Sequence, residues 1–139
     1  MRVVPIIIAL PFLFGCSALV GNQSTIEARS VLSSPNPWPT PLLTSDPAPK
    51  LLRLWMNETT IPSGTDWYGR AVTSTNVASL EIRTESFSFV ANRTAYGEFT
   101  FRQHVLDMVP YYKRPYVLHV IARNAAGDAV EDRVRIEFR

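Results

Sequence analysis

A single cysteine, Cys16, occurs in the chain of 139 residues, so no disulfide can form within it. A large excess of charge of one sign is also lacking: 14 Lys and Arg against 12 Asp and Glu leave a net charge of +2. So small a surplus does not form the basic stripe of a nucleic-acid-binding domain, and we expect no nucleic acid as partner. With 46% hydrophobic residues, the chain is too apolar to be disordered throughout, and its length fits one domain.

Signatures of catalysis and of cofactor binding are scarce. The two histidines, His104 and His119, fit no metal-binding spacing. Neither a Gly-x-Ser-x-Gly nucleophile motif nor a phosphate-binding glycine loop occurs. Asp128, Glu131 and Asp132 cluster and could chelate calcium weakly, but a solvated hairpin edge is the simpler interpretation. The sequence therefore predicts no enzyme, no metal site and no small-molecule cofactor.

The most apolar part of the chain is its first 21 residues. An uncharged run from Val3 to Gly21 has the character of an export signal and is also long enough to span a bilayer. Within it, Leu13-Phe14-Gly15-Cys16 resembles the bacterial lipoprotein box, in which a leucine and a small residue precede the cysteine. The resemblance implies that a signal peptide, residues 1–15, is removed and that Cys16 becomes the lipidated N-terminus.

Two other interpretations of this segment remain open. A plain secretory signal could be cut after Ala18, because Cys16-Ser17-Ala18 follows the small-x-small rule, and the apolar run could also be retained as an anchor. All three interpretations place the rest of the chain outside the cytoplasm. We therefore expect a cell-envelope protein that is held to the membrane by its N-terminal lipid, with a secreted protein as the alternative.

Residues 16–49 are rich in serine and proline. Six prolines lie between Pro35 and Pro49, which excludes a helix or a central strand there. Alternating prolines favour an extended polyproline II spacer. We predict a disordered, lipid-anchored tether over 16–49. As an alternative to a plain linker, Trp38 could dock into an aromatic-lined groove of a partner.

From residue 50 onward the pattern predicts β-strands. They are expected at 51–56, 67–73, 76–84, 87–91, 98–102, 116–122 and 134–138. Apolar and polar residues alternate, which places Ala78, Leu80 and Ile82 on one face of their strand. Asn124 and Gly127 delimit the turn of a C-terminal hairpin, because both tolerate unusual backbone conformations. The sequence predicts an all-β fold, an antiparallel β-sandwich of about seven strands.

The twelve residues from Tyr116 to Gly127 resemble the penultimate strand and final hairpin of immunoglobulin-like and fibronectin type III domains. The resemblance implies that residues 50–139 form an immunoglobulin-like sandwich of the branch that lacks the disulfide between its sheets. Tyr116 stands two places before Leu118, where a disulfide-bonded antibody domain has its second cysteine. It is therefore similar to the tyrosine-corner residue, whose ring is buried and whose hydroxyl bonds the backbone upstream.

One loop has the composition of a binding surface. Between two prolines, Tyr111, Tyr112, Lys113 and Arg114 combine two aromatic rings with two cations. Rings give contact area at low entropic cost, and a cation orients an acidic or sugar partner. The alternative is a loop that packs back on the sandwich.

These observations favour a binding module. We expect a non-catalytic envelope lipoprotein that presents its domain for interaction with another envelope protein or for surface assembly. A carbohydrate-binding or adhesin-like module is the first alternative, although Trp55, Trp67 and Tyr68 fit core or sheet-face positions better than a carbohydrate platform. A small secreted hydrolase is the second alternative.

Overall fold

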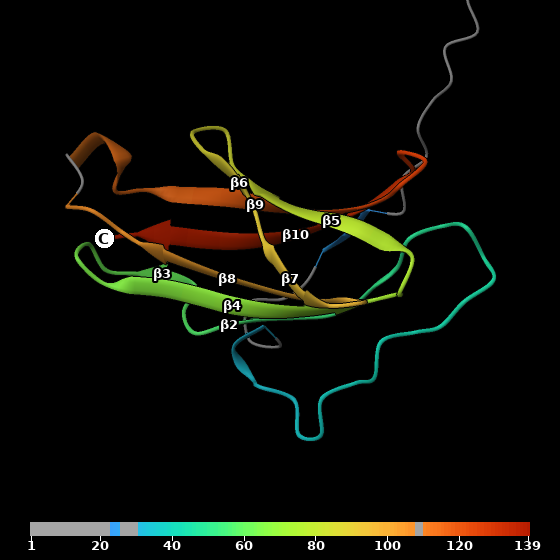
Figure 1. Cartoon of the computed structure of the whole chain (residues 1–139). Coiled ribbons are helices and arrows are strands. Elements are labelled where there is room, and N and C mark those ends of the chain that lie inside the picture. The colour runs from blue at the N-terminus through green and yellow to red at the C-terminus, as the bar shows by residue number, and fades with distance from the viewer. Residues whose placement is uncertain (1–22, 26–30, 108–109) are drawn as a thin grey trace, which may run out of the picture.

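The computed structural model describes residues 23–25, 31–107 and 110–139, and the regular structure of these residues is almost entirely β-strand (Figure 1). These residues contain ten strands and one short 3-10 helix. In chain order they are β1 (Gln23–Thr25), β2 (Leu51–Met56), β3 (Thr60–Ile61), β4 (Asp66–Thr73), β5 (Val77–Arg83), β6 (Ser88–Val90), β7 (Asn92–Ala95), β8 (Glu98–His104), η1 (Pro110–Tyr112), β9 (Pro115–Asn124) and β10 (Ala129–Phe138).

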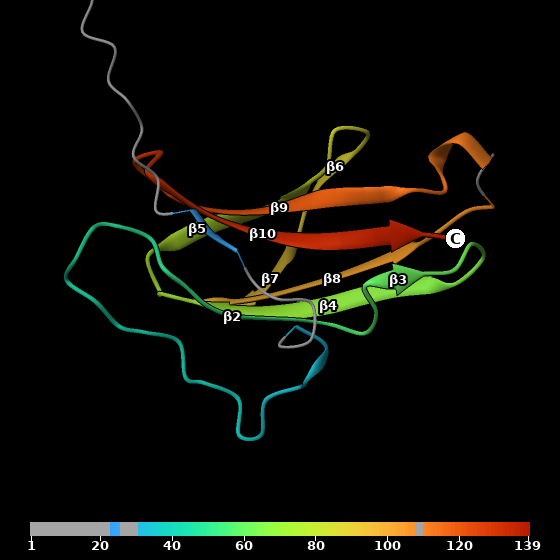
Figure 2. The same cartoon turned by 180° about the vertical axis from the view of Figure 1, so that it is seen from behind.

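The strands form two sheets that face each other, as two opposite views show (Figure 1, Figure 2). One sheet has the order β2-β4-β8-β7 and is antiparallel throughout. The other has the order β1-β10-β9-β5-β6, and β3 also pairs with β10. Both β1 and β3 run parallel to β10, so this second sheet is mixed. The expected all-β fold is confirmed as a two-layered arrangement of sheets.

Alternating apolar side chains of both sheets form the core. In the β9–β10 hairpin, Leu118 pairs with Val134 and Tyr116 with Ile136, and all four side chains are buried. Trp67 on β4 contributes the largest buried ring, and it is 1% exposed. Burying one such side chain contributes about 1.5 to 3 kcal/mol, so the predicted alternation supplies much of the stability of the fold.

The prediction for Ala78 is wrong, because this residue is exposed and Val77 is buried in its place. A β-bulge between Val77 and Ser79 interrupts the pairing of β5 with β9. A bulge adds a residue to one strand and thereby reverses the alternation on one side of it. Leu80 and Ile82, beyond the bulge, face the core as expected.

The strand expected at 87–91 is present as the shorter β6, and a further strand that was not expected, β7, follows it in the other sheet. β6 pairs with β5 in one sheet and β7 pairs with β8 in the other. Between them lies Ala91, which is 6% exposed and whose amide donates to the Leu80 carbonyl oxygen at 2.8 Å. With β7 and the very short β1 and β3, the described strands number ten, so the expected count of about seven is not confirmed.

The proline-rich segment 31–49 repeatedly contacts the β2-β4-β8-β7 sheet. It is the cyan trace below β2 in Figure 1. The ring of Trp38 lies 6.4 Å from that of Trp55, and Leu42 forms an isolated bridge with Ser74. This differs from the extended spacer that the prolines predict. Prolines prevent regular structure, but they leave side chains and carbonyl groups free to contact the sheet.

Candidate recognition loop

The loop predicted to bind a partner follows β8, and its residues 110–112 form η1. Tyr111 is 73% exposed and Tyr112 is 45% exposed. Their ring centroids are 5.3 Å apart with an interplanar angle of 83°. The Lys113 amide donates to the Pro110 carbonyl oxygen at 3.1 Å and closes the turn. The turn therefore presents two rings, edge to face, at the end of the sandwich that also carries the C-terminus (Figure 1).

Both cations of the loop have acidic neighbours. Arg114 Nη2 lies 2.6 Å from Glu85 Oε1, and Lys113 Nζ lies 3.8 Å from Asp107 Oδ1. The Arg114 guanidinium also lies 4.8 Å from the ring centroid of Tyr116. These ion pairs are partly exposed, so each contributes little to stability. Their effect is to hold the Arg114 guanidinium beside the tyrosines.

Tyr116 connects this loop to the core. Its side chain is 5% exposed, and its ring centroid lies 5.6 Å from that of Phe138. The hydroxyl donates a hydrogen bond to the Tyr112 carbonyl oxygen at 3.1 Å. This is the contact that the immunoglobulin-like resemblance implies for Tyr116. Because the ring is fixed in the core, the hydrogen bond fixes the backbone of Tyr112 and of its neighbour Tyr111 relative to the sheets.

A recess of about 370 Å³ with a mixed polar and apolar lining lies beside the loop. It is lined by Glu85, Arg114, Pro115, Tyr116, Val117, His119 and Arg135. Two guanidinium groups, an imidazole and one carboxylate therefore surround it.

Each histidine is paired with a carboxylate, and the two pairs belong to different sheets. On β8, His104 Nδ1 lies 2.8 Å from Asp66 Oδ1, and this hydrogen bond lowers the pKa of Asp66. On β9, His119 Nδ1 lies 2.6 Å from Glu131 Oε1, to which Arg133 Nε also donates at 2.9 Å. Burial alone would raise the pKa of Glu131, but these two hydrogen bonds outweigh it and lower the pKa. The structure does not bring the two histidines together.

The acidic residues considered for calcium do not converge on one point. Asp128 bonds Asn124, whose amide nitrogen Nδ2 donates to Asp128 Oδ2 at 2.8 Å. Glu131 belongs to the pair with the histidine, and Asp132 is 6% exposed. In the part of the chain that the structure describes, no group of three or more His, Cys, Asp or Glu side chains could hold a metal ion.

The turn predicted between the last two strands is present. Gly127 has φ of +94°, a conformation that glycine adopts without a steric penalty. Its amide donates to the Asn124 carbonyl oxygen at 3.2 Å, and the Asp128 amide donates to Asn124 Oδ1 at 2.9 Å. Asn124 and Gly127 therefore have structural contacts of the expected kind.

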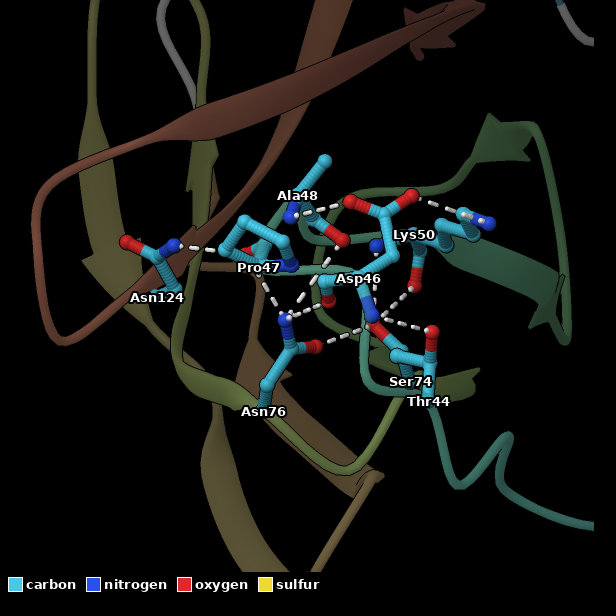
Figure 3. Close-up of polar contacts among 8 residues, drawn as sticks. All are labelled: Thr44, Asp46, Pro47, Ala48, Lys50, Ser74, Asn76 and Asn124. Carbon is cyan, nitrogen blue, oxygen red and sulfur yellow. Dashed lines mark hydrogen bonds and ion pairs between the residues drawn. The ribbon is translucent and has the colours of Figure 1, made fainter.

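A polar network at this turn was not predicted from the sequence. The Asn76 side chain donates to the three successive carbonyl oxygens of residues 46–48 at 2.8 to 3.4 Å, and it accepts from Ser74 Oγ at 2.6 Å (Figure 3). Asn124 Nδ2 donates to the Pro47 carbonyl oxygen at 2.8 Å as well. The network fastens the proline-rich segment to the β4–β5 and β9–β10 turns. The contacts of Asn76 and Asn124 with this segment join residues 28 to 77 positions apart, so no local pattern reveals them.

Aromatic residues also gather on the outer face of the β2-β4-β8-β7 sheet. The ring of Trp55 lies 6.4 Å from that of Trp38 and 5.9 Å from that of Tyr68. The Arg70 guanidinium lies 4.4 Å from the centroid of the Trp38 ring. Trp55 and Tyr68 are thus sheet-face residues and Trp67 is a core residue, as expected. The contribution of Trp38 was missed because it comes from the proline-rich segment.

An open apolar cleft of about 340 Å³ lies where β6 and β8 leave the core uncovered. Its lining includes Trp67, Phe87, Phe89 and Phe138, whose rings pack on one another. Because Phe87 and Phe89 are half-buried and belong to the same packing as the core, we interpret the cleft as the open edge of the sandwich.

Cys16 lies outside the described residues, so its lipidation stays a prediction. Within residues 23–25, 31–107 and 110–139, no helix is long and apolar enough to cross a membrane. No model of a known protein family matches the chain, and a search of curated proteins finds no similar sequence.

Proposed function

We propose that the chain is a non-catalytic lipoprotein of the cell envelope whose domain binds another envelope protein, or joins a surface assembly, through the loop Tyr111–Arg114. The observation that carries this proposal is the fixed exposure of Tyr111 and Tyr112. Their rings are in solvent while buried Tyr116 holds the backbone beneath them. Aromatic side chains on a pre-organised loop lose little entropy on binding, which is typical of interface hot spots.

An immunoglobulin-like module is the finer description of the fold that we propose. In that family one sheet has the strand order A-B-E-D and the other contains strands C, F and G. The orders β2-β4-β8-β7 and β5-β9-β10 follow this scheme when β2 is taken as strand A, with β6 as an extra edge strand. The hydrogen bond from Tyr116 to the backbone upstream supports the same assignment.

The anchor that we propose is a lipid on Cys16, which would place the domain on the outer side of a membrane. Cells that express the wild type or Cys16→Ser are labelled with a fatty-acid analogue. We expect label on the wild type alone, because the variant has no thiol. Equal label on both proteins, or a mature chain that begins at Leu19, would contradict the anchor.

Recognition by the loop is tested by affinity capture from detergent-solubilised envelopes. The double variant Tyr111→Ser/Tyr112→Ser should lose the captured protein, whereas Tyr96→Ser should retain it. Tyr96 is 72% exposed, which matches Tyr111, and it lies in the β7–β8 turn at the other end of the sandwich. Capture of the same protein by the double variant would contradict a role for the loop.

A glycan is the second candidate partner, favoured by the outer-face cluster of Trp38, Trp55 and Tyr68. Tyr68 is 40% exposed and the two tryptophans are half-buried, and aromatic faces suit the apolar faces of sugar rings. If glycan binding is lost in Trp38→Ala and retained in the double tyrosine variant, the partner is a sugar and not a protein. A hydrolase, the third candidate, requires turnover that disappears on replacement of His104 or His119.

A further inference from the structure

We propose that the end of the sandwich remote from Tyr111 rests on the membrane, with Leu43 and Tyr96 in the interfacial layer of the lipid bilayer. This inference rests on the proposed lipid at Cys16. It adds an orientation to the anchor: one end of the domain contacts lipid and the other carries the recognition loop.

The point where the chain enters the sheet favours this end. β1 is parallel to β10 and Gln23 pairs with Glu131, which is the third residue of β10 after the Asn124–Gly127 turn. The chain therefore enters the sheet near that turn. Cys16 precedes Gln23 by seven positions, and a chain spans at most about 3.6 Å per residue, so the acylated residue lies within about 25 Å of Gln23.

Two exposed apolar side chains occupy the same end. Leu43 is 86% exposed and Tyr96 is 72% exposed. Their segments are adjacent, because a Cβ built on Gly97 would lie 2.6 Å from the Pro41 Cβ. The Arg93 guanidinium lies 5.1 Å from the ring centroid of Tyr96. Leucine, tyrosine and arginine together suit a bilayer interface, where the leucine meets acyl chains and the arginine meets phosphates.

The backbone that carries Leu43 is held in place. The Leu42 amide donates to the Thr73 carbonyl oxygen at 3.3 Å, and the Thr75 amide donates to the Leu42 carbonyl oxygen at 2.9 Å. The network around Asn76 fixes the residues that follow (Figure 3). The exposed leucine is thus presented on a fixed loop, and contact with lipid requires no rearrangement of the loop.

Exposure alone would not distinguish the two ends. At the opposite end Leu106 is 72% exposed and Tyr111 is 73% exposed. That end lies farther from the point where the chain enters the sheet, because the seven residue steps from Glu131 to Phe138 extend about 23 Å along β10 at about 3.3 Å per residue. An upright domain would place Tyr111 away from the lipid, where a protein partner can reach it.

The test uses the full lipidated protein in vesicles of phosphatidylethanolamine and phosphatidylglycerol. Cysteine is introduced in Leu43→Cys, Tyr96→Cys or, as the matched control, Tyr111→Cys, and it is labelled with an environment-sensitive dye. Acylated Cys16 does not react with the dye. We expect the labels at 43 and 96 to shift to the blue and to lose emission to spin-labelled lipids, while the label at 111 keeps its emission.

The outcomes separate this inference from the anchor, because mass spectrometry of the same sample reports on Cys16. An unmodified Cys16 overturns the anchor, and the inference falls with it. Acylated protein whose labels at 43 and 111 are quenched equally, or whose label at 111 is quenched more, overturns the inference alone.

Discussion

The two ends of the sandwich hold their loops in different ways. At one end, a buried aromatic residue, Tyr116, reaches from the core to a single carbonyl group of the loop. At the other end, the side chain of Asn76 bonds three successive carbonyl oxygens of a proline-rich segment, largely at the surface. Both devices fix a loop, but the first couples the loop to the hydrophobic core and the second does not.

Because of this difference, we expect mutations at the two ends to have different effects on the stability of the domain. Damage to the Tyr116 contact should disturb both the loop Tyr111–Arg114 and the core beneath it. Damage to the Asn76 network should release residues 46–48 and leave the sheets intact. The predictions below test this distinction, starting with the largest expected effect.

Removal of the Tyr116 ring should destabilise the domain most. Tyr116→Ala creates a cavity and is expected to lower the free energy of unfolding by about 3 to 5 kcal/mol. Tyr116→Phe keeps the ring, loses only the hydrogen bond to Tyr112 and should cost about 0.5 to 1.5 kcal/mol. Denaturant unfolding measures both. A similar loss for the two variants would show that the ring does not contribute as a core residue.

Removal of the Asn76 side chain should have an intermediate effect. Asn76→Ala loses several hydrogen bonds to residues 46–48 and should cost about 1 to 2 kcal/mol in urea unfolding. Limited proteolysis should cleave near these residues more rapidly than in the wild type. Asn92→Ala, at an exposed position of the edge strand β7, is the matched control and should cost less than about 0.5 kcal/mol. Equal stability of the two variants would contradict a fixed segment.

The pair of His119 and Glu131 should contribute less to the free energy of unfolding than Asn76 does, and acid should remove this contribution. Because the folded protein lowers the pKa of Glu131, the contribution is complete above the ordinary glutamate pKa and disappears as the pH falls through the folded value. The side chain is 22% exposed, so we expect about 1 kcal/mol or less. Unfolding of Glu131→Gln between about pH 6 and pH 3 should depend less on pH than that of the wild type. Identical pH profiles of the variant and the wild type would show that Glu131 does not contribute to the pH dependence of stability.

Replacement of the exposed tyrosines should affect stability least. Tyr111→Ala and Tyr112→Ala are each expected to change the free energy of unfolding by less than about 0.5 kcal/mol, while they weaken capture of a partner. Differential scanning calorimetry and affinity capture of the same preparations compare the two effects. If either variant destabilised the domain as strongly as Tyr116→Ala, the loop would be a packed structural element.

The sequence predicts the long strands well and the connections poorly. Alternation identifies β9 and β10 and the buried face of each, because every second residue from Tyr116 to Ala122 is apolar. A two-residue strand such as β3 has no period to detect. The bulge that exposes Ala78 is also invisible to a strict alternation.

At the candidate site, too, the features formed by neighbouring residues could be predicted, and the contacts between distant residues could not. The loop Tyr111–Arg114 was recognised because its four informative residues are contiguous. The role expected of Tyr116 is what the resemblance of residues 116–127 to immunoglobulin-like hairpins implies, and those residues are also contiguous. The Asn76 network could not be found in this way, because Asn76 meets residues 46–48 only after the fold brings the β4–β5 turn to them.

The most direct test of the contrast between the two ends is site-specific photo-cross-linking in the cells that produce the protein. A photoreactive phenylalanine analogue replaces Tyr111 in one variant and Leu43 in another. The account predicts a discrete protein adduct from position 111 and no protein adduct from position 43, which would face lipid. A protein adduct from position 43, with none from position 111, would contradict it.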